Sequence, residues 1–342
     1  MSTKKSTRST PLPHAAERRA TLRLLAITAA SWFGIGGSAR AAAQVQPVTL
    51  PQLRIGYQKG SFTLVLARGL GLVEKQLPGT AVSWVEFPAG PQLLEALAVG
   101  SVDIGSTGDS PPVFAQAAGK DLLYVGAEPP KPTSSAILVR HDAPIRTLAD
   151  LKGKRIALQK GSSAHFLTVQ AVKKGGLQWS DIQPVYLAPA DARAAFERGA
   201  VDAWAIWDPY YAAAEVDSGV RVLTTSQGLT GNNSFYLASR ALARNEPALR
   251  AIFSALTDSD AYVRSHRRES AEHFAQATGL GLATVLRVID RRPAAPVGPI
   301  TQALINDQQQ VADAFAQLGL IPRPLRVADI VWRPGQTVTA LR

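Results

Sequence analysis

A short motif that occurs twice, 99 positions apart, constrains the fold of this chain more than any other feature. The first copy runs from Gly100 to Asp109 and the second from Gly199 to Asp208, and a Val-Asp pair matches within them, Val102-Asp103 with Val201-Asp202. The tetrapeptide QKGS at residues 58–61 also returns at 159–162, an offset of 101. Two similar offsets indicate one unit of about a hundred residues that is used twice.

Each copy of the motif has the pattern of a strand that opens into a helix. In the first copy, small residues and Asp109 follow the apolar positions and two prolines come next; in the second, an apolar run leads directly to Asp208-Pro209, as at the start of many helices. Apolar runs typical of strands alternate with helically spaced segments as far as about residue 234, and amphipathic helices follow. Such alternation predicts α/β lobes built on largely parallel sheets, with ligand sites at the carboxyl ends of the strands. A length of 342 residues with 46% hydrophobic content is enough for two such cores.

The first 43 residues have the pattern of a cleaved export signal. A basic region precedes an apolar stretch at 22–35, and small residues at 39–43 lead to a polar start at Gln44. We expect cleavage after Ala43 or two residues earlier, since the apolar stretch is too short for a permanent membrane anchor. The pair Arg18-Arg19 fits a twin-arginine signal as well as an ordinary secretory one, and a mitochondrial presequence is a further alternative. The mature product is expected to be soluble and periplasmic.

The net charge of +11 does not point to nucleic acid. Residues 1–43 carry seven basic residues and one Glu, a net of +6, which leaves about 11 − 6 = +5 for the rest of the chain. That excess is mild and has no aromatic residues interleaved with it, so no nucleic-acid partner is expected. The chain contains no Cys, which excludes disulfides, thiol catalysis and a lipid anchor on an N-terminal Cys.

Motifs for catalysis and metal binding are not found. The histidines show no spacing typical of zinc ligands, and no G-x-S-x-G nucleophile elbow occurs. We therefore expect no catalytic residue, no cofactor and no metal. The arginines of the C-terminal third are interpreted as solvated helix faces; they include Arg264, Arg267, Arg268, Arg291 and Arg292.

The two QKGS turns are candidate anion sites. A strand-loop-helix turn rich in Gly and Ser presents unpaired amides and the positive end of a helix dipole. Ser61 and Ser162 either cap their helices or face a ligand. Lys59 and Lys160 are either cavity cations or ordinary exposed loop lysines.

The repeated aspartates, Asp109 and Asp208, are predicted to be helix N-caps because each precedes proline. A cap at these positions leaves donors at Thr107 and Gly108 free to face a ligand. In the aromatic group that contains Trp204, Tyr210 and Tyr211, Trp207 is the residue expected in a cleft, because it lies beside the turn. Glu128 either receives a positive group of a ligand or pairs with a lysine, and we favour the lysine.

Five segments resemble the aliphatic sulfonate-binding proteins of bacterial ABC importers. They are IGYQKGS at 55–61, WVEFPAGPQ at 84–92, STGD at 106–109, EPPKP at 128–132 and DAWAIWDPY at 202–210. The resemblance runs from about Leu53 to the C-terminal tail. The wider group includes binding proteins for taurine, nitrate and thiamine precursors, which stay as alternatives.

The resemblance implies a type II periplasmic binding protein. This fold has two doubly wound α/β lobes with a ligand cleft between them and C-terminal helices packed on the first lobe. We expect the first lobe at 44–138, the second at 139–234 and the return to the first lobe at 235–342. The implied function is capture of an alkanesulfonate, as a monomer, for delivery to a membrane permease powered by a cytoplasmic ATPase, in sulfur acquisition.

The chemistry of a sulfonate fits a site made of donors. A sulfonate stays ionised at physiological pH and offers only acceptors. Each charge-assisted hydrogen bond contributes roughly 1.5–3 kcal/mol, so three or four supply much of the roughly 8 kcal/mol that micromolar binding requires. The residues expected around the sulfonate are Gln58, Gly90, Thr107, Gly108, Ser162 and Ser163, and Trp207 is expected beside the alkyl tail.

An enzyme on the same two-lobed fold is the rival class. A porphyrin-pathway deaminase that holds its cofactor on a Cys is excluded, because this chain has none. A hydrolase of small anionic esters stays open, and turnover assays distinguish it from a carrier.

Overall fold

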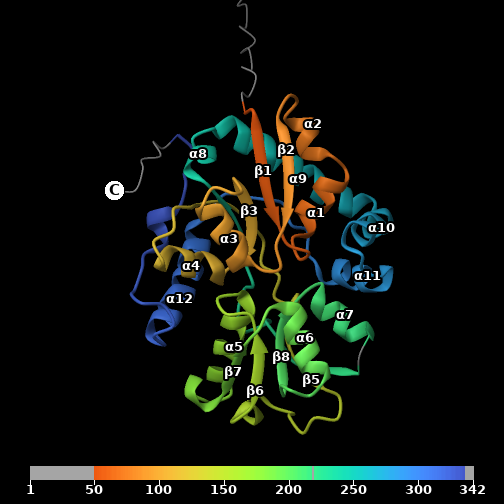
Figure 1. The fold of residues 1–342 in the computed structure, drawn as a ribbon, viewed down its shortest axis with the longest axis vertical. Helices are drawn as coiled ribbons and strands as arrows, with labels where there is room; N and C mark the ends of the chain where they lie inside the picture. Colours follow the sequence, from red (N-terminus) through yellow and green to blue (C-terminus); the bar gives the residue numbers. More distant parts are fainter. Residues whose placement is uncertain (1–49, 218, 336–342) are drawn as a thin grey trace, which may run out of the picture. The chain divides into compact units, whose positions relative to one another are not determined.

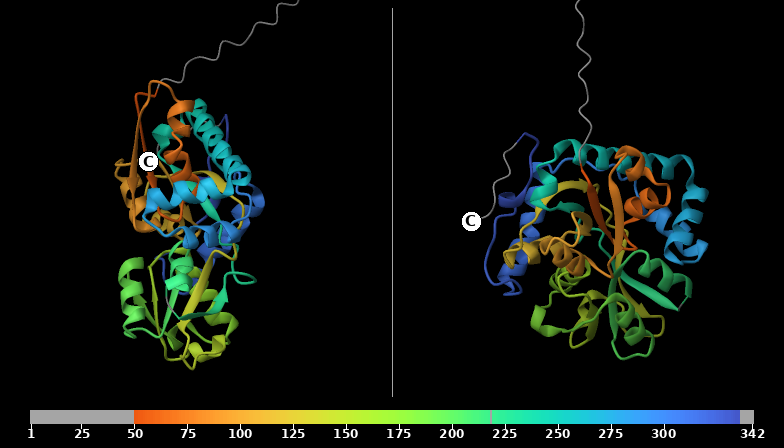
Figure 2. Two further views of the ribbon diagram at one scale, coloured as in Figure 1. Left: turned by 90° about the vertical axis from the view of Figure 1, so that its right-hand side faces the viewer. Right: turned by 45° about the horizontal axis from the view of Figure 1, so that its top comes forward.

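The computed structural model describes residues 50–217 and 219–335, and the expected export signal at 1–43 lies outside these ranges. The described chain forms two α/β lobes, each built on a five-stranded sheet (Figure 1). Helices cover both faces of each sheet (Figure 2). Within the described ranges, no helix is long and apolar enough to cross a membrane.

The sheet of the first lobe has the strand order β2-β1-β3-β10-β4. Strands β1, β2 and β3 are parallel, whereas β10 is antiparallel to both β3 and β4. The bounds are β1 Gln52–Tyr57, β2 Ala81–Glu86, β3 Ile104–Gly108, β4 Leu123–Glu128 and β10 Ser234–Ala238. Helices of the first lobe before the crossover are α1 Phe62–Gly69, α2 Leu72–Gln76, α3 Gly90–Ala98 and α4 Ser110–Ala117.

The sheet of the second lobe, β7-β6-β8-β5-β9, repeats that arrangement. Strand β6 is parallel to β7 and β8, and β5 is antiparallel to β8 and β9. The bounds are β5 Ser135–Arg140, β6 Arg155–Leu158, β7 Gln183–Tyr186, β8 Ala203–Trp207 and β9 Val220–Thr225. The helices are α5 Ser163–Lys174, α6 Pro189–Glu197 and α7 Tyr210–Asp217, with short 3-10 helices at Leu148–Leu151 and Trp179–Asp181.

The repeated Asp of the motif has the same structural role in both lobes. The Asp103 carboxylate accepts the backbone N–H of Arg54 at 2.8 Å and pairs with its guanidinium. Asp202 accepts the backbone N–H of Arg155 at 2.8 Å and pairs with that side chain in the same way. These contacts tie the chain before β3 to β1, and the chain before β8 to β6. The sequence repeat is therefore a repeat of the sheet architecture.

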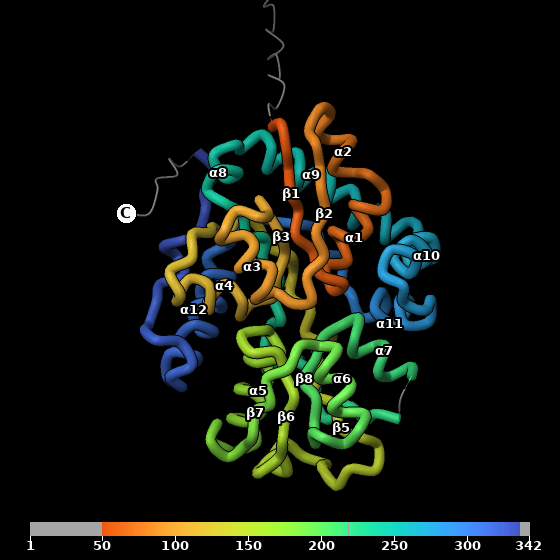
Figure 3. The backbone as a smooth tube through the Cα atoms, in the orientation of Figure 1, coloured from red at the N-terminus to blue at the C-terminus, as the bar shows by residue number. Residues whose placement is uncertain are grey.

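The chain passes twice between the lobes (Figure 3). The first crossover occupies residues 129–134 and the second residues 226–233, between β4 and β5 and between β9 and β10. The lobe boundary expected after residue 138 therefore falls inside β5, where Leu138 pairs with Trp204 and Val139 with Ala203 of the second sheet. The apolar residues that follow Ser135 are strand residues of the second lobe, so the chain has already crossed.

The C-terminal helices complete the first lobe. They are α8 Arg240–Ala243, α9 Glu246–Ser265, α10 Arg267–Thr278, α11 Leu282–Arg291 and α12 Gln302–Gln317, with a 3-10 helix at Val327–Ile330. Leu256, Phe274 and Phe315 from these helices are buried in the same core as Ile55 and Ile104 of the first sheet. The second lobe has two smaller cores, one on each face of its sheet.

Candidate functional site

A cavity lies between the lobes, where β1, β3 and β8 end. All seven residues expected at the site line it: Gln58, Gly90, Thr107, Gly108, Ser162, Ser163 and Trp207. They come from five separate parts of the chain and from both lobes. The repeat therefore places the ends of equivalent strands on opposite walls of one cavity.

Three helices begin at the wall of this cavity. They are α1, α3 and α5, whose first residues Phe62, Gly90 and Ser163 all line it. The first amides of an α-helix have no acceptor within the helix, and the helix dipole places partial positive charge there. Three helix starts directed at one cavity form a site suited to an anion.

The serines at the starts of α1 and α5 do not cap their helices. Neither the hydroxyl of Ser61 nor that of Ser162 accepts a helix amide. The Ser61 Oγ accepts from the Gln58 N–H at 3.3 Å, and the Ser162 Oγ donates to the Gln159 carbonyl at 2.7 Å. Both hydroxyls are bonded inside their own turns, and the capping alternative is wrong for both.

Side-chain donors at the site are largely engaged within the protein. The Gln58 Nε2 donates to the Ser106 carbonyl at 2.9 Å, and the Thr107 hydroxyl donates to the Gly108 carbonyl at 3.0 Å. The helix amides are thus the main donors that the expected site residues leave for a ligand. Gly90 is essential to this arrangement, because a Cβ there would lie 2.6 Å from Cγ of Pro111.

The prediction that Asp109 is a helix N-cap is wrong. Asp109 is buried at the N-cap position of α4, but its backbone is helical and its side chain makes no capping hydrogen bond. An N-cap needs a non-helical backbone so that its side chain folds back on the first turn. The carboxylate instead accepts the hydroxyls of Ser110 and of Ser163 in the opposite lobe. Burial raises the pKa of Asp109 to about 6, against these hydrogen bonds.

Asp208 does cap a helix, and its carboxylate also pairs with a residue of the other lobe. Its Oδ1 accepts the Ala212 N–H in the first turn of α7 at 3.0 Å and pairs with Arg291 of α11 at 3.1 Å. Burial raises the pKa of Asp208 to about 7, although Arg291 acts to lower it. Arg291 also pairs with Glu215 and lies over the Tyr211 ring, 3.8 Å from its centroid.

The reading of Arg291 and Arg292 as a solvated helix face is therefore wrong. Both side chains are largely buried, and Arg292 lines the cavity. Its guanidinium pairs with Asp260 at 3.2 Å and lies 4.0 Å from the Glu128 carboxylate. Arg291 ends the amphipathic helix α11 and Arg292 follows it, and a charge pattern along one helix does not reveal contacts with distant parts of the chain.

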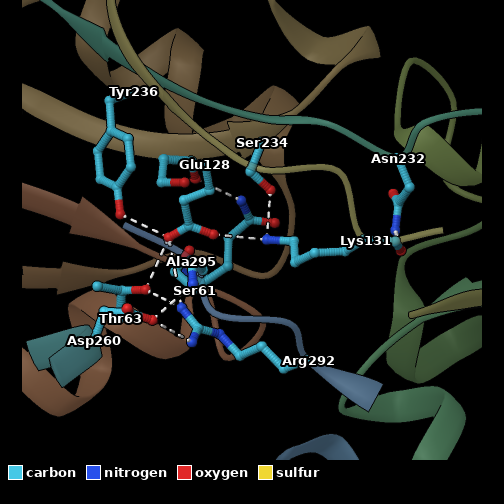
Figure 4. Close-up of polar contacts among 12 residues, drawn as sticks. Ser61, Thr63, Glu128, Lys131, Asn232, Ser234, Tyr236, Asp260, Arg292 and Ala295 are labelled. Atoms are coloured by element: carbon cyan, nitrogen blue, oxygen red, sulfur yellow. Dashed lines mark hydrogen bonds and ion pairs between the residues drawn. The ribbon is translucent and has the colours of Figure 1, made fainter. Parts of the chain in front are cut away.

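Glu128 pairs with a lysine, as we favoured (Figure 4). Lys131 Nζ donates to its Oε2 at 2.7 Å, and the hydroxyls of Thr63 and Tyr236 donate to its Oε1 at 2.8 and 2.9 Å. Burial acts to raise the pKa of Glu128, but Lys131 and Arg292 outweigh it and lower the pKa to about 2. Both oxygens of the carboxylate are thus bonded to groups of the protein.

The two lysines of the QKGS turns do not line the cavity. Lys59 Nζ donates to the Thr278 carbonyl at the end of α10 at 3.1 Å. Lys160 Nζ lies 5.5 Å from the Tyr186 ring centroid. Both lysines are therefore loop residues outside the cavity and not cavity cations, and each has a local partner.

The aromatic group divides as expected. Trp204 is buried in the core of the second lobe, whereas Trp207 lines the cavity. Tyr210 packs edge-on against Trp207, with 6.2 Å between ring centroids. With Phe62 and Val288, Trp207 forms an apolar part of the cavity wall.

Several lining residues escaped the sequence interpretation. They include Lys131, Ser134, Asn232, Ser234 and Arg292. The first four lie in or beside the two crossovers, whose Pro-rich and polar composition was visible as loops but carried no sign that they border a ligand cavity. Arg292 reaches the site only through the packing of the C-terminal helices.

Comparisons with known proteins agree with this architecture. The family model described as NMT1/THI5 like matches residues 78–270. The aliphatic sulfonates-binding protein of Escherichia coli (strain K12) is 51% identical over 285 residues, which cover 83% of this chain and 89% of that protein.

Two solved structures are also similar. The alkanesulfonate-binding protein SsuA from Xanthomonas axonopodis pv. citri, bound to MOPS, has a TM-score of 0.80 and 51% identity, with 83% of this chain and 98% of that chain covered. The periplasmic aliphatic sulphonate binding protein SsuA from Escherichia coli has a TM-score of 0.78 and 49% identity, with 85% and 95% covered. The two-lobed architecture, the cavity and these similarities together show that the chain belongs to the NMT1/THI5-like family and, within it, to the group of the aliphatic sulfonate-binding proteins.

Proposed function

We propose that this chain is the substrate-binding component of an ABC importer and that it captures aliphatic sulfonates in the cavity between its lobes. The observation that carries the proposal is the convergence of the starts of α1, α3 and α5 on one cavity. The relatives that are named as sulfonate-binding proteins support the choice of a sulfonate as the anion.

The expected pose follows from the two kinds of wall. The sulfonate oxygens accept from amides at Gly90, Gly108 and Ser163, while the alkyl tail lies against Trp207 and Val288. A sulfonate oxygen is an acceptor only, so it matches amide N–H groups without needing a protein acceptor. Three or four such hydrogen bonds, at roughly 1.5–3 kcal/mol each, supply much of the roughly 8 kcal/mol that micromolar binding requires, and burial of the alkyl tail adds to them.

Calorimetry on the mature protein tests the proposal. Alkanesulfonates of increasing length are titrated beside taurine, sulfate, nitrate and an alkyl carboxylate of matched length. We expect binding of the alkanesulfonates at micromolar concentration and weaker binding of the carboxylate. A clear preference for nitrate, taurine or a thiamine precursor, or no sulfonate binding, would contradict the assignment.

The role in transport implies a location and a partner. We propose that residues 1–43 direct export to the periplasm and are removed, and that the monomeric protein then delivers its ligand to a membrane permease powered by a cytoplasmic ATPase. N-terminal sequencing of the exported protein locates the cleavage site. Its export in a strain that lacks the twin-arginine pathway distinguishes the two routes.

We further propose that the protein is a carrier and not an enzyme. The bound sulfonate is expected to be released chemically unchanged, which mass spectrometry of the ligand after prolonged incubation can measure. Conversion of a sulfonate or of a small anionic ester would favour the hydrolase alternative.

A further inference from the structure

Lys131 lies on the segment that both lobes share. Its backbone N–H donates to the Gly231 carbonyl of the second crossover at 3.1 Å, and its own carbonyl accepts from Asn232 Nδ2 at 2.9 Å. The backbone of this one residue therefore binds the two crossovers together. Its side chain reaches from there into the cavity wall.

The ammonium group of Lys131 has a donor to spare. Two of its three N–H groups are used, one by the Glu128 Oε2 at 2.7 Å and one by the Ser234 Oγ at 2.8 Å (Figure 4). No third hydrogen bond of this ammonium is found among residues 50–217 and 219–335. The side chain is 14% exposed, so little water is available to satisfy that third N–H.

Glu128 does not consume the whole charge of Lys131. Its Oε1 already accepts the hydroxyls of Thr63 and Tyr236, and the Arg292 guanidinium lies 4.0 Å away. Arg292 is paired more closely with Asp260, at 3.2 Å, so Lys131 is the cation whose carboxylate partner is shared with two hydroxyls. Lys131 borders the cavity, and so does Arg292, whose guanidinium is paired with Asp260.

We propose that Lys131 donates its third N–H to the anionic group of the bound ligand and is the charged anchor of the site. The inference rests on the proposed binding of sulfonates and adds a contact residue to it. An ammonium is a compact charge with rotatable donors, so it meets a three-oxygen anion without demanding one orientation. Because Lys131 also joins the two crossovers, the ligand would contact the crossovers as well as both lobes.

A pair of variants separates this role from that of a counter-ion for Glu128. Lys131→Met alone leaves the buried Glu128 short of a partner, so it is expected to lower both the melting temperature and the affinity for ethanesulfonate. The double variant Glu128→Gln/Lys131→Met removes both charges and keeps the shapes. We expect it to recover most of the melting temperature while its affinity stays weaker than wild type by about tenfold to a hundredfold, the range for one charge-assisted hydrogen bond.

The outcomes are distinct. Recovery of both stability and affinity in the double variant would show that Lys131 serves Glu128 alone, and would overturn the inference. Failure of the wild-type protein to bind any sulfonate would instead remove the proposed function. Lys160→Met is the matched control, because Lys160 packs on Tyr186 outside the cavity; its affinity should equal that of wild type.

A measurement on the wild-type protein decides the matter if the variants do not fold. With 15N-labelled lysine, the side-chain resonance of Lys131 should shift when ethanesulfonate is added, and that of Lys160 should not. An unchanged Lys131 resonance at saturating ligand would contradict direct contact.

Discussion

Gly108 of the first lobe lies directly against Ser163 of the second: a Cβ atom at Gly108 would be 1.9 Å from the Ser163 Oγ and 3.2 Å from its Cβ. Gly108 ends β3 and Ser163 begins α5, so the two residues meet across the cavity. The absence of a side chain at Gly108 allows the lobes to approach this closely. The approach of the two lobes thus depends on a contact between two residues that line the cavity.

Gly108→Ala is therefore expected to impair closure. The added methyl must displace the Ser163 side chain, which also bonds to Asp109. We expect at least a tenfold loss of sulfonate affinity by calorimetry, with little change in melting temperature, because each lobe keeps its own core. Gly281→Ala is the control, since nothing lies within 4 Å of a Cβ there and its φ is negative. Wild-type affinity in Gly108→Ala would show that the lobes bind ligand without this approach.

Ser162→Asp tests whether the start of α5 faces the anion. Ser162 is buried at the cavity wall, and its hydroxyl is bonded to the Gln159 carbonyl. A carboxylate there competes with the ligand for the helix dipole and repels it at short range. We expect at least a tenfold loss of affinity, and unchanged affinity would remove this helix start from the site.

Ser239→Asp is the matched control for that charge. Ser239 caps α8 by accepting the Leu242 N–H at 3.2 Å, and it does not line the cavity. Asp is as good a cap as Ser. The substitution should change neither the affinity nor the melting temperature appreciably.

The fold was predictable because its signals are local and repeated. The apolar runs predicted as strands within the described residues are strands, and the matched positions Asp103 and Asp202 make the same contacts in equivalent sheets. The seven expected site residues also line one cavity, because strand ends and helix starts at equivalent points of two similar lobes must face each other.

What escaped prediction depends on contacts between distant parts of the chain. Arg292 meets Glu128 only after the C-terminal helices have packed on the first lobe, and no local pattern marks either residue for the other. The prediction of a cap at Asp109 failed because the partner of this carboxylate, Ser163, belongs to the opposite lobe. A capping rule uses only neighbouring residues in the sequence, so it does not include a contact between the two lobes.

The Glu128 cluster predicts a component of acid sensitivity. The pKa of Glu128 is lowered from 4.5 to about 2 in the folded protein, so its ionised form stabilises the fold above pH 4.5 and this contribution is lost as the pH falls toward 2. At 1.36 kcal/mol per unit, wild type should lose about 2 kcal/mol of unfolding free energy between pH 6 and pH 3 through this group. Denaturant unfolding of Glu128→Gln should show a correspondingly flatter decline.

Glu272→Gln is the control for the pH experiment. Glu272 is an exposed residue that pairs with Arg268 on the surface of α10, so its removal should leave the pH dependence as in wild type. Equal pH dependence in wild type and Glu128→Gln would show that Glu128 has the same pKa in the folded and unfolded protein.

Substitution of Arg291 tests how much the arrangement of the lobes depends on an ion pair between them. It belongs to α11 of the first lobe, and all its charged partners lie in the second, at Asp208 and Glu215. An open form that separates α11 from α7 would solvate these groups separately, so we expect Arg291→Gln to remove a contact that favours the closed form. The apparent affinity falls with the fraction of closed protein, and loss of a buried ion pair of this kind is expected to weaken sulfonate binding about tenfold.

Calorimetry gives the affinity of Arg291→Gln, and small-angle scattering at saturating ligand shows whether the variant still closes. Arg267→Gln is the matched control, because Arg267 of α10 pairs with the exposed Asp290 of α11, and no ion pair joins it to the described residues of the second lobe. If both variants bind as wild type does, Arg291 serves the packing of α7 and not closure. If only Arg291→Gln binds weakly but reaches the same compact form at saturation, the ion pair shifts the equilibrium between open and closed forms and does not shape the site itself.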